Sequence, residues 1–473
     1  MRKIVIEPVS RVEGHAKITI HLDDEGEVSD AYFHVLQYRG FEKFCEGRMF
    51  WEMPLITSRV CGICYTSHHL ASAKACDEIL GIEITETARK LRELLQTGEI
   101  IQSHALHFFY LASPDLLFGM ESEPKRRNIA ALIKEKPSLA KAGIHLRKFG
   151  QSIFERLSGS RIHINYAIPG GVNAALTDED RRKMLEEIPN RIHEAEKAIE
   201  FVKDYCREHE DEALNFARFD SKYLGLIDEK GNLEFYDGKL RMKSENGSII
   251  EELEPENYGS IINEAVEDWS YMKFPYYSKE GFPHGMYRVG PLARLNVADQ
   301  ISTPLAKNEM MEFKKYGENG IVNSLLLYHY ARLIEILHTL EKAKSLLEDQ
   351  NICSRDIFQR ARQSNNEGIG IIEAPRGVLI HHYHVNGHGV IQKCNLVVAT
   401  VHNNLAMNKA IMEVARNYIK KDEIKEGILN RLEVAIRCYD PCLSCATHAV
   451  GQMPLQVQII SSEGKLIRVL SRT

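Results

Sequence analysis

Residues 59–68 read RVCGICYTSH, and residues 440–448 read DPCLSCATH. Each segment contains one Cys-x-x-Cys pair, the first near the start of the chain and the second near its end. Two cysteines at this spacing lie on one tight turn, where both sulfurs can bind the same ion. The sequence therefore predicts that distant parts of the chain meet around a metal site with four sulfur ligands. The four cysteines are Cys61, Cys64, Cys442 and Cys445.

Polar residues flank both cysteine pairs. Four cysteines alone favour a structural zinc site, which needs no charged side chain beside it. Here Arg59 and His68 flank the first pair. Asp440 and His448 flank the second. An arginine lowers the pKa of a thiolate and a histidine can donate a hydrogen bond to sulfur, so the flanking residues favour a reactive metal centre over a structural one.

The composition is that of an ordinary globular protein. Of 473 residues, 44% are hydrophobic and 27% are charged. The net charge of −6 gives no basic surface of the kind that binds nucleic acid. No apolar run reaches the roughly 18 residues that span a bilayer. The N-terminus also lacks the apolar core of a signal peptide, so we expect a cytoplasmic protein, although a subunit can be exported on its partner's signal.

Six of the ten cysteines lie outside the two pairs. They are scattered, mostly among apolar neighbours, and we interpret them as buried small hydrophobic residues. A secreted disulfide framework is not expected in a chain of this length without a signal peptide.

The alternation of apolar and polar residues predicts an α+β fold. We expect a mostly helical body with β-sheet sections at the N-terminus, in a middle insert at about 222–250 and near the C-terminus. Pro114 is expected to end one long helix, and Thr177 to cap another. Strands are predicted within residues 1–38, at 223–227 and 233–236, and in a tail hairpin of 455–460 and 465–470. Helices are predicted within 48–112, at 129–158, at 177–209, as a long amphipathic helix at 320–350, and at 402–421.

Together the two cysteine motifs resemble the paired signature of NiFe hydrogenase large subunits. That signature reads R-x-C-G-x-C-x-x-x-H near the N-terminus and D-P-C-x-x-C-x-x-H near the C-terminus. The resemblance runs from residue 10 to residue 448 and so covers nearly the whole chain. The further matching segments, in order, are SRVEGH at 10–15, YRGFE at 38–42, the stretch from His163 to the PGG at 169–171, EAPRG at 373–377 and LVVAT at 396–400.

The resemblance implies a role for each cysteine. Cys61 and Cys442 match the terminal ligands of nickel. Cys64 and Cys445 match the thiolates that bridge nickel to iron. In the family, carbon monoxide and cyanide complete the shell of the iron, and no side chain supplies them.

Residues around the metals also match the family. Arg376 matches a guanidinium that overhangs the open face of the metals, and Asp440 matches its carboxylate neighbour. Thr400, with Ala399 before it, matches the donors to a cyanide. His68 matches the donor to a bridging sulfur.

Two further implications concern a second metal and the end of the chain. Glu42, the backbone carbonyl of Leu396 and His448 match a buried magnesium site.

In the family a protease cuts after the last histidine of the second motif once nickel is in place. Here that bond is His448–Ala449, so the resemblance implies a catalytic domain of residues 1–448 and a removable extension of residues 449–473.

The chemistry of hydrogen agrees with these roles. Dihydrogen is a very weak acid, so splitting it heterolytically needs a metal and a base within bonding reach. Cys442 as a terminal thiolate can be that base, and Glu13 is the natural next position for the proton. Without the family, Glu13 could equally be a salt-bridged surface carboxylate.

The resemblance implies the reaction H₂ ⇌ 2H⁺ + 2e⁻ and a partner that carries electrons away. Because the six remaining cysteines lack cluster spacing, we expect no iron–sulfur cluster in this chain and a small subunit that holds such clusters. The chain looks most like the methanogen branch, the F420-non-reducing hydrogenases, which implies heterodisulfide reductase and a further electron-transfer subunit as partners. The alternatives are another cytoplasmic hydrogenase linked to F420 or NAD, a non-catalytic scaffold similar to one of the complex I subunits, and a structural zinc protein. The scaffold relative lacks the four cysteines.

Other histidines are weaker candidates. The tract HHYHVNGH at 381–388 suggests a metal site, but its alternation favours a β-hairpin after residues 373–377. His104 and His107 share one face of an apolar helix, and we interpret them as packed core residues.

Overall fold

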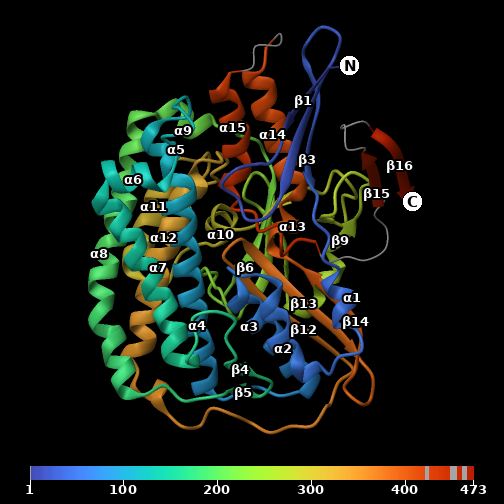
Figure 1. Cartoon of the computed structure of the whole chain (residues 1–473). Helices are drawn as coiled ribbons and strands as arrows, with labels where there is room; N and C mark the ends of the chain where they lie inside the picture. The colour runs from blue at the N-terminus through green and yellow to red at the C-terminus, as the bar shows by residue number, and fades with distance from the viewer. Residues whose placement is uncertain (1, 421–424, 448–454, 461–465, 473) are drawn as a thin grey trace.

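The computed structural model describes residues 2–420, 425–447, 455–460 and 466–472. A bundle of long helices forms one side of the molecule and several small sheets form the other (Figure 1). The predicted α+β class is confirmed. Among the described residues, no helix is both long enough and apolar enough to cross a membrane.

Long helices that pack against one another make up the bundle (Figure 1). Thr85 and Thr177 begin two of them, because their hydroxyls accept hydrogen bonds from backbone N–H groups of the first turn. The predicted cap at Thr177 and helix end near residue 209 are confirmed. The bundle helices are α4 (Glu86–Ala105), α7 (Pro137–Ser158), α8 (Asp178–Glu208) and α12 (Leu327–Glu348), with α6 (Ile129–Glu135) and α11 (Pro304–Lys314) beside them.

Two helix predictions need correction. Pro114 does not end a helix, because α4 continues into a π-helical segment, Leu106–Ala112, and Pro114 then lies in the first turn of α5 (Ser113–Phe118). A proline is tolerated there since its missing N–H would have no helical partner. Helix α12 begins at Leu327, not near residue 320, and is not amphipathic at first, because every residue from 327 to 340 is buried.

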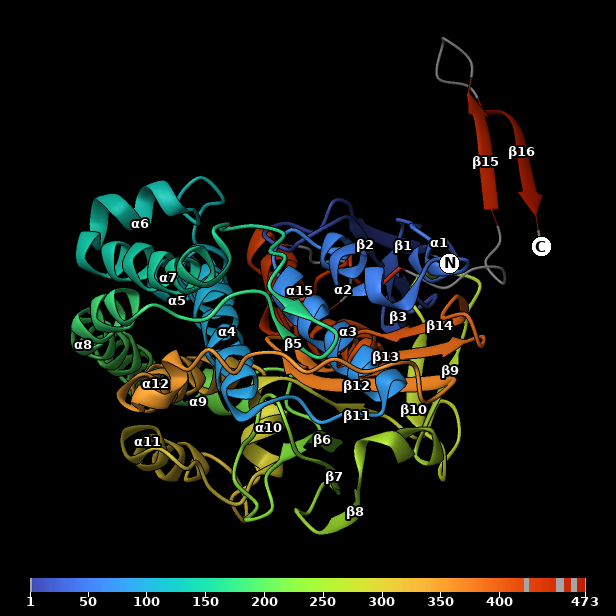
Figure 2. The ribbon, with the colours of Figure 1, turned by 90° about the horizontal axis from the view of Figure 1, so that it is seen from below.

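A three-stranded antiparallel sheet in the order β12–β13–β14 supports the functional site. Its strands are β12 (Glu367–Ala374), β13 (Gly377–Val385) and β14 (Ile391–Val397). Helix α3 (Tyr65–Leu80) lies along β12 (Figure 2). Contact is close because Gly368 and Gly370 present no side chain to the helix: a Cβ on Gly370 would lie 1.9 Å from the carbonyl oxygen of Ala71.

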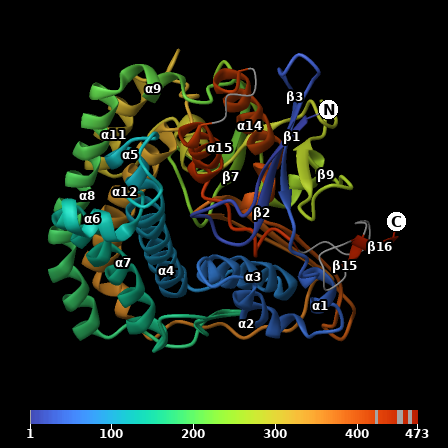
Figure 3. The same cartoon turned by 45° about the horizontal axis from the view of Figure 1, so that its top comes forward.

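The predicted N-terminal strands are confirmed as the sheet β1–β2–β3. Helix α14 packs against β3 and α15 (Figure 3). The Asn408 side chain accepts a hydrogen bond from the Phe33 backbone N–H at 2.8 Å. The elements are β1 (Arg2–Ile6), β2 (Ala16–Leu22), β3 (Val28–Val35), α14 (Asn404–Tyr418) and α15 (Glu426–Cys438).

The middle insert is longer than the predicted 222–250. Its sheet has the order β11–β6–β7–β8, and a separate hairpin pairs β9 with β10. The predicted strand at 233–236 is wrong: Phe235 gives its carbonyl to the backbone N–H of Glu373 in β12, and its own N–H bonds to the Glu234 carboxylate. The strands are β6 (Lys222–Ile227), β7 (Lys239–Lys243), β8 (Ile249–Leu253), β9 (Ile262–Ala265), β10 (Phe274–Tyr277) and β11 (Tyr287–Arg288).

The remaining elements are short, apart from the tail hairpin. The tail strands pair antiparallel, as predicted, and stand outside the body (Figure 2). The helices are α1 (Phe41–Cys45), α2 (Met53–Thr57), α9 (Glu210–Asn215), α10 (Pro291–Val297) and α13 (Ala399–His402), with 3₁₀ segments Phe50–Glu52, Ser58–Val60, Pro255–Ser260 and Gln350–Cys353. The strands are β4 (Ala167–Ile168), β5 (Gly171–Val172), β15 (Leu455–Ile460) and β16 (Leu466–Arg472).

A buried ionic network joins the bundle to the sheet. Arg294 forms 2.7 Å ion pairs with Glu335 of α12 and Glu373 of β12. The same guanidinium donates to the carbonyls of Ala374 and Pro375 at 2.9 and 3.1 Å. Arg294 therefore fixes the turn between β12 and β13, which carries Arg376.

The close approach of α3 to β12 gives a test of the fold. Gly370→Ala forces the helix and the strand apart, and we expect a loss of about 1–3 kcal/mol in stability. Because α3 follows directly after Cys64, nickel retention should fall too. Thermal unfolding of the purified protein and its metal content measure both effects. Gly387→Ala is the control, since a Cβ there meets no atom within 4 Å; equal stability of the two variants would contradict the packing argument.

Candidate metal centre

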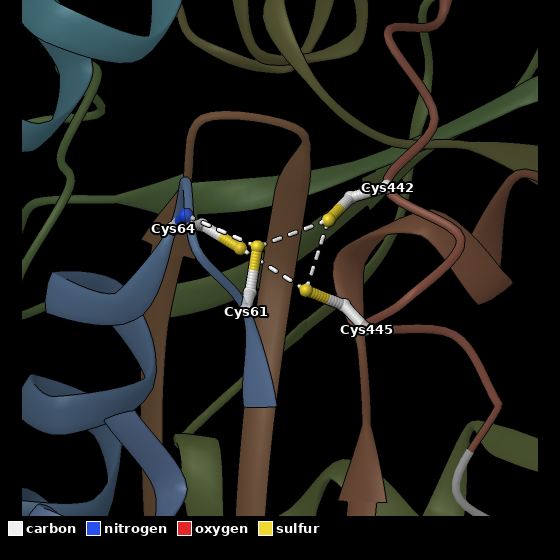
Figure 4. Close-up of side chains that lie close together, drawn as sticks. All are labelled: Cys61, Cys64, Cys442 and Cys445. Atoms are coloured by element: carbon white, nitrogen blue, oxygen red, sulfur yellow. Dashed lines mark hydrogen bonds between the residues drawn. The ribbon is translucent and has the colours of Figure 1, made fainter. Parts of the chain in front are cut away.

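Two loops from opposite ends of the chain meet at the cysteine site (Figure 4). Cys61 follows the 3₁₀ segment Ser58–Val60, and Cys64 is the N-cap of α3. The second pair lies on the loop that follows α15. The N-terminal loop packs against this second loop: a Cβ on Gly14 would lie 2.7 Å from the Cβ of Leu443, and the φ of +90° at Gly14 also favours glycine.

The four sulfurs converge as the sequence predicts. All of them lie within 4.8 Å of one another. The Sγ atoms of Cys61 and Cys442 are 3.2 Å apart, as are those of Cys64 and Cys445. Cys442 and Cys445 are 3.0 Å apart, and all four cysteines are buried. The backbone N–H groups of Ile63 and Cys64 point to the sulfur of Cys61 at 3.1 and 3.3 Å.

Electrostatics make this cluster a cation site. Hydrogen bonds from the other three cysteines hold the pKa of the Cys61 thiol well below its usual range, whereas burial raises the pKa of Cys442 and Cys445 well above it. Several thiolates cannot share a buried site unless positive charge neutralises them. Metal ions supply that charge and displace the thiol protons. The donor set thus fits the predicted pair of metals.

Arg376 extends toward the sulfurs from the turn between β12 and β13. Its Nε donates to the backbone carbonyl of Asp440 at 2.5 Å, and its Nη2 donates to the carboxylate at 3.1 Å. A third contact runs from Nη1 to the hydroxyl of Ser103 at 3.4 Å. Burial opposes the charge, but Asp440 and the neighbouring thiolates raise the pKa of Arg376 well above its usual value, so the guanidinium is a fixed cation at the site.

Arg59 does not fill the role predicted for it. Its side chain is exposed, because the 3₁₀ segment before Cys61 directs it to the surface. The arginine whose charge helps to lower the pKa of Cys61 is Arg376, which lies far away in the sequence.

His68 lines a small cavity beside Cys64 and Cys445. Burial lowers the pKa of His68 to about 4, so its ring is neutral. Its Nδ1 lies 3.0 Å from Nε2 of His381, whose Nδ1 lies 2.6 Å from the hydroxyl of Tyr383. The Tyr383 hydroxyl in turn donates to the hydroxyl of Ser72 at 2.9 Å. The hydrogen bond from His68 to a bridging sulfur stays a prediction.

The same cavity has mostly apolar walls. Thr400 and Ala399 line it at the start of α13, where the Thr400 hydroxyl accepts a 3.0 Å hydrogen bond from the Cys442 backbone N–H. That bond leaves the hydroxyl hydrogen available to donate. The apolar lining residues are Ala374, Leu379, Val398 and Ala399.

Glu13 lies half-buried against the second cysteine loop. Its carbonyl accepts from the Leu443 N–H at 3.1 Å, and Glu13 forms a single parallel bridge with Cys442. Its carboxylate accepts from the backbone N–H of Ser444 at 2.9 Å and from the Ser444 hydroxyl. Glu13 is therefore held beside the cysteine loop and is not a free surface carboxylate.

The predicted magnesium ligands are only partly described. Glu42 and Leu396 are neighbours, but Leu396 presents its N–H to the carboxylate, at 2.9 Å. Lys273 places its ammonium 3.3 Å from Glu42 and 3.2 Å from Glu264. His448 lies outside the described residues. The prediction of magnesium therefore stays a prediction.

Comparison with known proteins agrees with this site. Residues 39–134 and 209–448 match the family described as nickel-dependent hydrogenase. The chain belongs to that family. Residues 3–38 match a family described as HoxL-like.

Relatives of this hydrogenase match along nearly its full length. The chain is 42% identical to the beta subunit of the NAD-reducing hydrogenase HoxS of Cupriavidus necator, over 98% of this chain and 99% of the relative. It is 43% identical to the corresponding chain of the F420-non-reducing hydrogenase vhc of Methanococcus voltae, over 99% and 100%. A solved NAD⁺-reducing NiFe hydrogenase in its H₂-reduced state superposes with a TM-score of 0.92, at 44% identity, over 95% of this chain and 100% of that one.

Three contributors to the hydrogenase site were missed from the sequence. Ser103 contacts Arg376, His381 contacts His68, and Arg39 holds the second cysteine loop through a 3.2 Å bond to the Ser444 carbonyl. Two of the three left a signal: Arg39 as the arginine of the YRGFE segment, and His381 as the first residue of the tract at 381–388. His104 and His107, by contrast, are buried as predicted. Nε2 of His104 lies 2.7 Å from the Glu335 carboxylate, and Nε2 of His107 lies 2.8 Å from the Arg437 carbonyl oxygen.

Proposed function

We propose that this hydrogenase subunit splits H₂ at a nickel–iron centre and passes the electrons to an iron–sulfur small subunit. Family membership makes the chain an oxidoreductase that acts on hydrogen. The observation that carries the finer assignment is the convergence of four buried sulfurs beside Arg376. In this proposal the thiolates of Cys61, Cys64, Cys442 and Cys445 would hold the nickel and the iron.

The cavity beside the sulfurs supports small, non-protein ligands on the iron. Carbon monoxide needs an apolar wall, and cyanide needs hydrogen-bond donors. The apolar residues of the cavity supply the wall. The start of α13, at Ala399 and Thr400, supplies the donors, together with the fixed charge of Arg376.

The protein's part in catalysis is to move protons and hold charge. The bound metal pair supplies the Lewis acidity and redox chemistry that polarise H₂ and accept its electrons. The two protons of H₂ pass one after the other to the Cys442 sulfur and from there to the Glu13 carboxylate. Ser444 fixes the Glu13 side chain through two hydrogen bonds, which keeps the acceptor beside the cysteine loop. Arg376 and Asp440 hold charge constant beside the reacting hydrogen.

The electrons need a second polypeptide. Outside the site, the described chain brings no three cysteines within ligand distance of one another. We therefore infer a small subunit with iron–sulfur clusters, within a cytoplasmic complex. Two relatives named as F420-non-reducing hydrogenases are 43% and 46% identical to the chain, which supports a role in methanogenesis with heterodisulfide reductase as acceptor, reached through a further electron-transfer subunit.

An NAD-linked complex is the second candidate. The NAD-reducing relative is as similar in sequence, at 42% identity. Hydrogen-dependent reduction of NAD⁺ by the native complex separates the two candidates, because only the NAD-linked enzyme would catalyse it.

A divalent ion at Glu42 is also part of the proposal. Glu42 and Glu264 share the ammonium of Lys273, so this partly buried group of side chains keeps a net negative charge. Burial raises the pKa of Glu42, which a nearby cation would reverse. Magnesium prefers such oxygen ligands. His448 and the Leu396 carbonyl would complete the protein ligands.

Metal analysis with an activity assay tests the proposed centre. The purified native complex should reduce a viologen dye with H₂ and contain nickel and iron in equal amounts, with magnesium counted in the same analysis. Cys445→Ala should abolish nickel retention, because it removes one of four strong bonds. Cys353→Ala, which changes a half-buried cysteine outside the site, should retain the metals. Zinc in place of nickel and iron would show that the site is structural.

Glu13→Gln tests the proton path. The amide keeps the shape of the side chain but cannot carry a proton onward, so metals should load while turnover falls by about two orders of magnitude or more. Exchange of H₂ with deuterated solvent should fall with turnover. Glu433→Gln is the matched control, because Glu433 holds Ser10 of the same N-terminal loop. Normal exchange in Glu13→Gln would place the relay elsewhere.

We further propose that residues 449–473 are removed once nickel has been inserted. The family match ends at residue 448, and the tail strands pair with each other. A lone two-stranded hairpin is marginally stable, so its loss would cost the body little. Intact-mass measurement of active, nickel-loaded protein should find a subunit that ends at His448. A fully active subunit that keeps its tail would contradict the cleavage.

A further inference from the structure

Three potential metal ligands gather on the outer face of the β12–β13 pair. His382 and His384 are two residues apart on β13, so both side chains leave the same face of the sheet. Glu367 of β12 lies directly opposite His384 in the antiparallel register. Side chains alternate along this strand: His381 and Tyr383 are buried and face the catalytic site, whereas His382 and His384 are partly exposed.

The spacing of these ligand atoms suits a single ion. One carboxylate oxygen of Glu367 lies 2.6 Å from Nε2 of His382 and 3.8 Å from Nε2 of His384. Ligand atoms around one zinc ion lie about 3.3 Å apart, because each bond is about 2.0–2.1 Å long. The two distances bracket this value. The side-chain exposures of 40% for His384 and 53% for Glu367 leave both free to adjust by a small rotation.

His382 is oriented as metal-ligating histidines are. Its Nδ1 lies 2.8 Å from the hydroxyl of Tyr258, which is buried in the 3₁₀ segment Pro255–Ser260. A partner on one ring nitrogen fixes the tautomer and leaves the other nitrogen to bind the ion. Here Nε2 is the remaining nitrogen, and it already faces Glu367.

The surroundings favour a cation. Glu78, Glu256, Glu367 and His384 line one surface hollow, so three carboxylates lie together on this face. Lys393, which stands opposite His384 on β14, and Lys74, whose charge acts on Glu78, oppose this charge, but the three carboxylates outnumber these two ammonium groups. A bound divalent ion would relieve the repulsion among the carboxylates.

We propose that Glu367, His382 and His384 form a second metal site, which binds one divalent transition-metal ion of the Zn²⁺ or Ni²⁺ type. Two imidazoles and one carboxylate are the ligand types that these ions share, and water completes the shell. The site is separate from the sulfur cluster, from which it differs in ligand chemistry and exposure. It does not depend on the proposed catalytic function.

Equilibrium dialysis of the purified hydrogenase complex tests the proposal. The complex is treated with EDTA to remove exposed ions, desalted, and dialysed against graded ZnSO₄ or NiSO₄ at neutral pH, and the bound ion is counted by mass spectrometry. The wild type should bind one more ion per subunit than His384→Ala or Glu367→Gln, or bind it about tenfold or more tightly.

His388→Ala is the matched control, because His388 is an exposed histidine of the same tract outside the cluster. It should bind the ion as the wild type does. Hydrogen-dependent dye reduction should be unchanged in all three variants, which shows that they fold. Equal ion binding by His384→Ala, Glu367→Gln and His388→Ala would overturn the proposal, as would a wild type that takes up no ion.

Discussion

Four cysteine sulfurs packed within 4.8 Å of one another, in a region closed to water, are the constraint on which the rest of this hydrogenase depends. Sulfur ligands become thiolates on binding metal, and thiolates in a low-dielectric interior repel one another unless cations lie among them. The metals supply most of this positive charge. Arg376 supplies a further positive charge that is present whether or not the metals are bound. The carboxylate of Asp440, in turn, holds the guanidinium in place.

Elements far from the cysteines also determine where Arg376 and the sulfurs lie. Arg376 lies at the end of β12, Cys64 lies at the start of α3, and the two elements are joined by the glycine contact at Gly370. Arg294 contacts the same turn and ties it to α12 of the bundle. Helices far from the sulfurs thereby set the position of the charge beside them. Substitutions in the core should accordingly affect metal loading as well as stability.

The features that were predicted correctly from the sequence are those that depend on interactions between nearby residues or on a known motif. Thr177 as a cap and the convergence of two Cys-x-x-Cys loops both follow from residues close together in the chain or from a recurring motif. The errors arose where a distant segment provides the partner. Residues 233–236 have the composition of a strand, but Glu373 takes the carbonyl of Phe235. Arg59 lies close to the first cysteine pair in the sequence, but the guanidinium that lies beside the sulfurs in the structure is that of Arg376. The pairing of His68 with His381 likewise needs the three-dimensional arrangement of α3 on the sheet.

The placement of the cysteines has a consequence for biosynthesis. Cys61 and Cys64 are translated well before Cys442 and Cys445, their partners 381 residues further along the chain. Cys61 and Cys64 must therefore stay reduced, without the other two sulfur ligands, while the bundle and the sheets assemble around them. No four-sulfur site exists until the second pair has been translated, so metal loading acts on a chain in which the bundle and the sheets have already been synthesised. The cell must supply nickel and iron to the polypeptide after translation, and it must protect the early thiols until then.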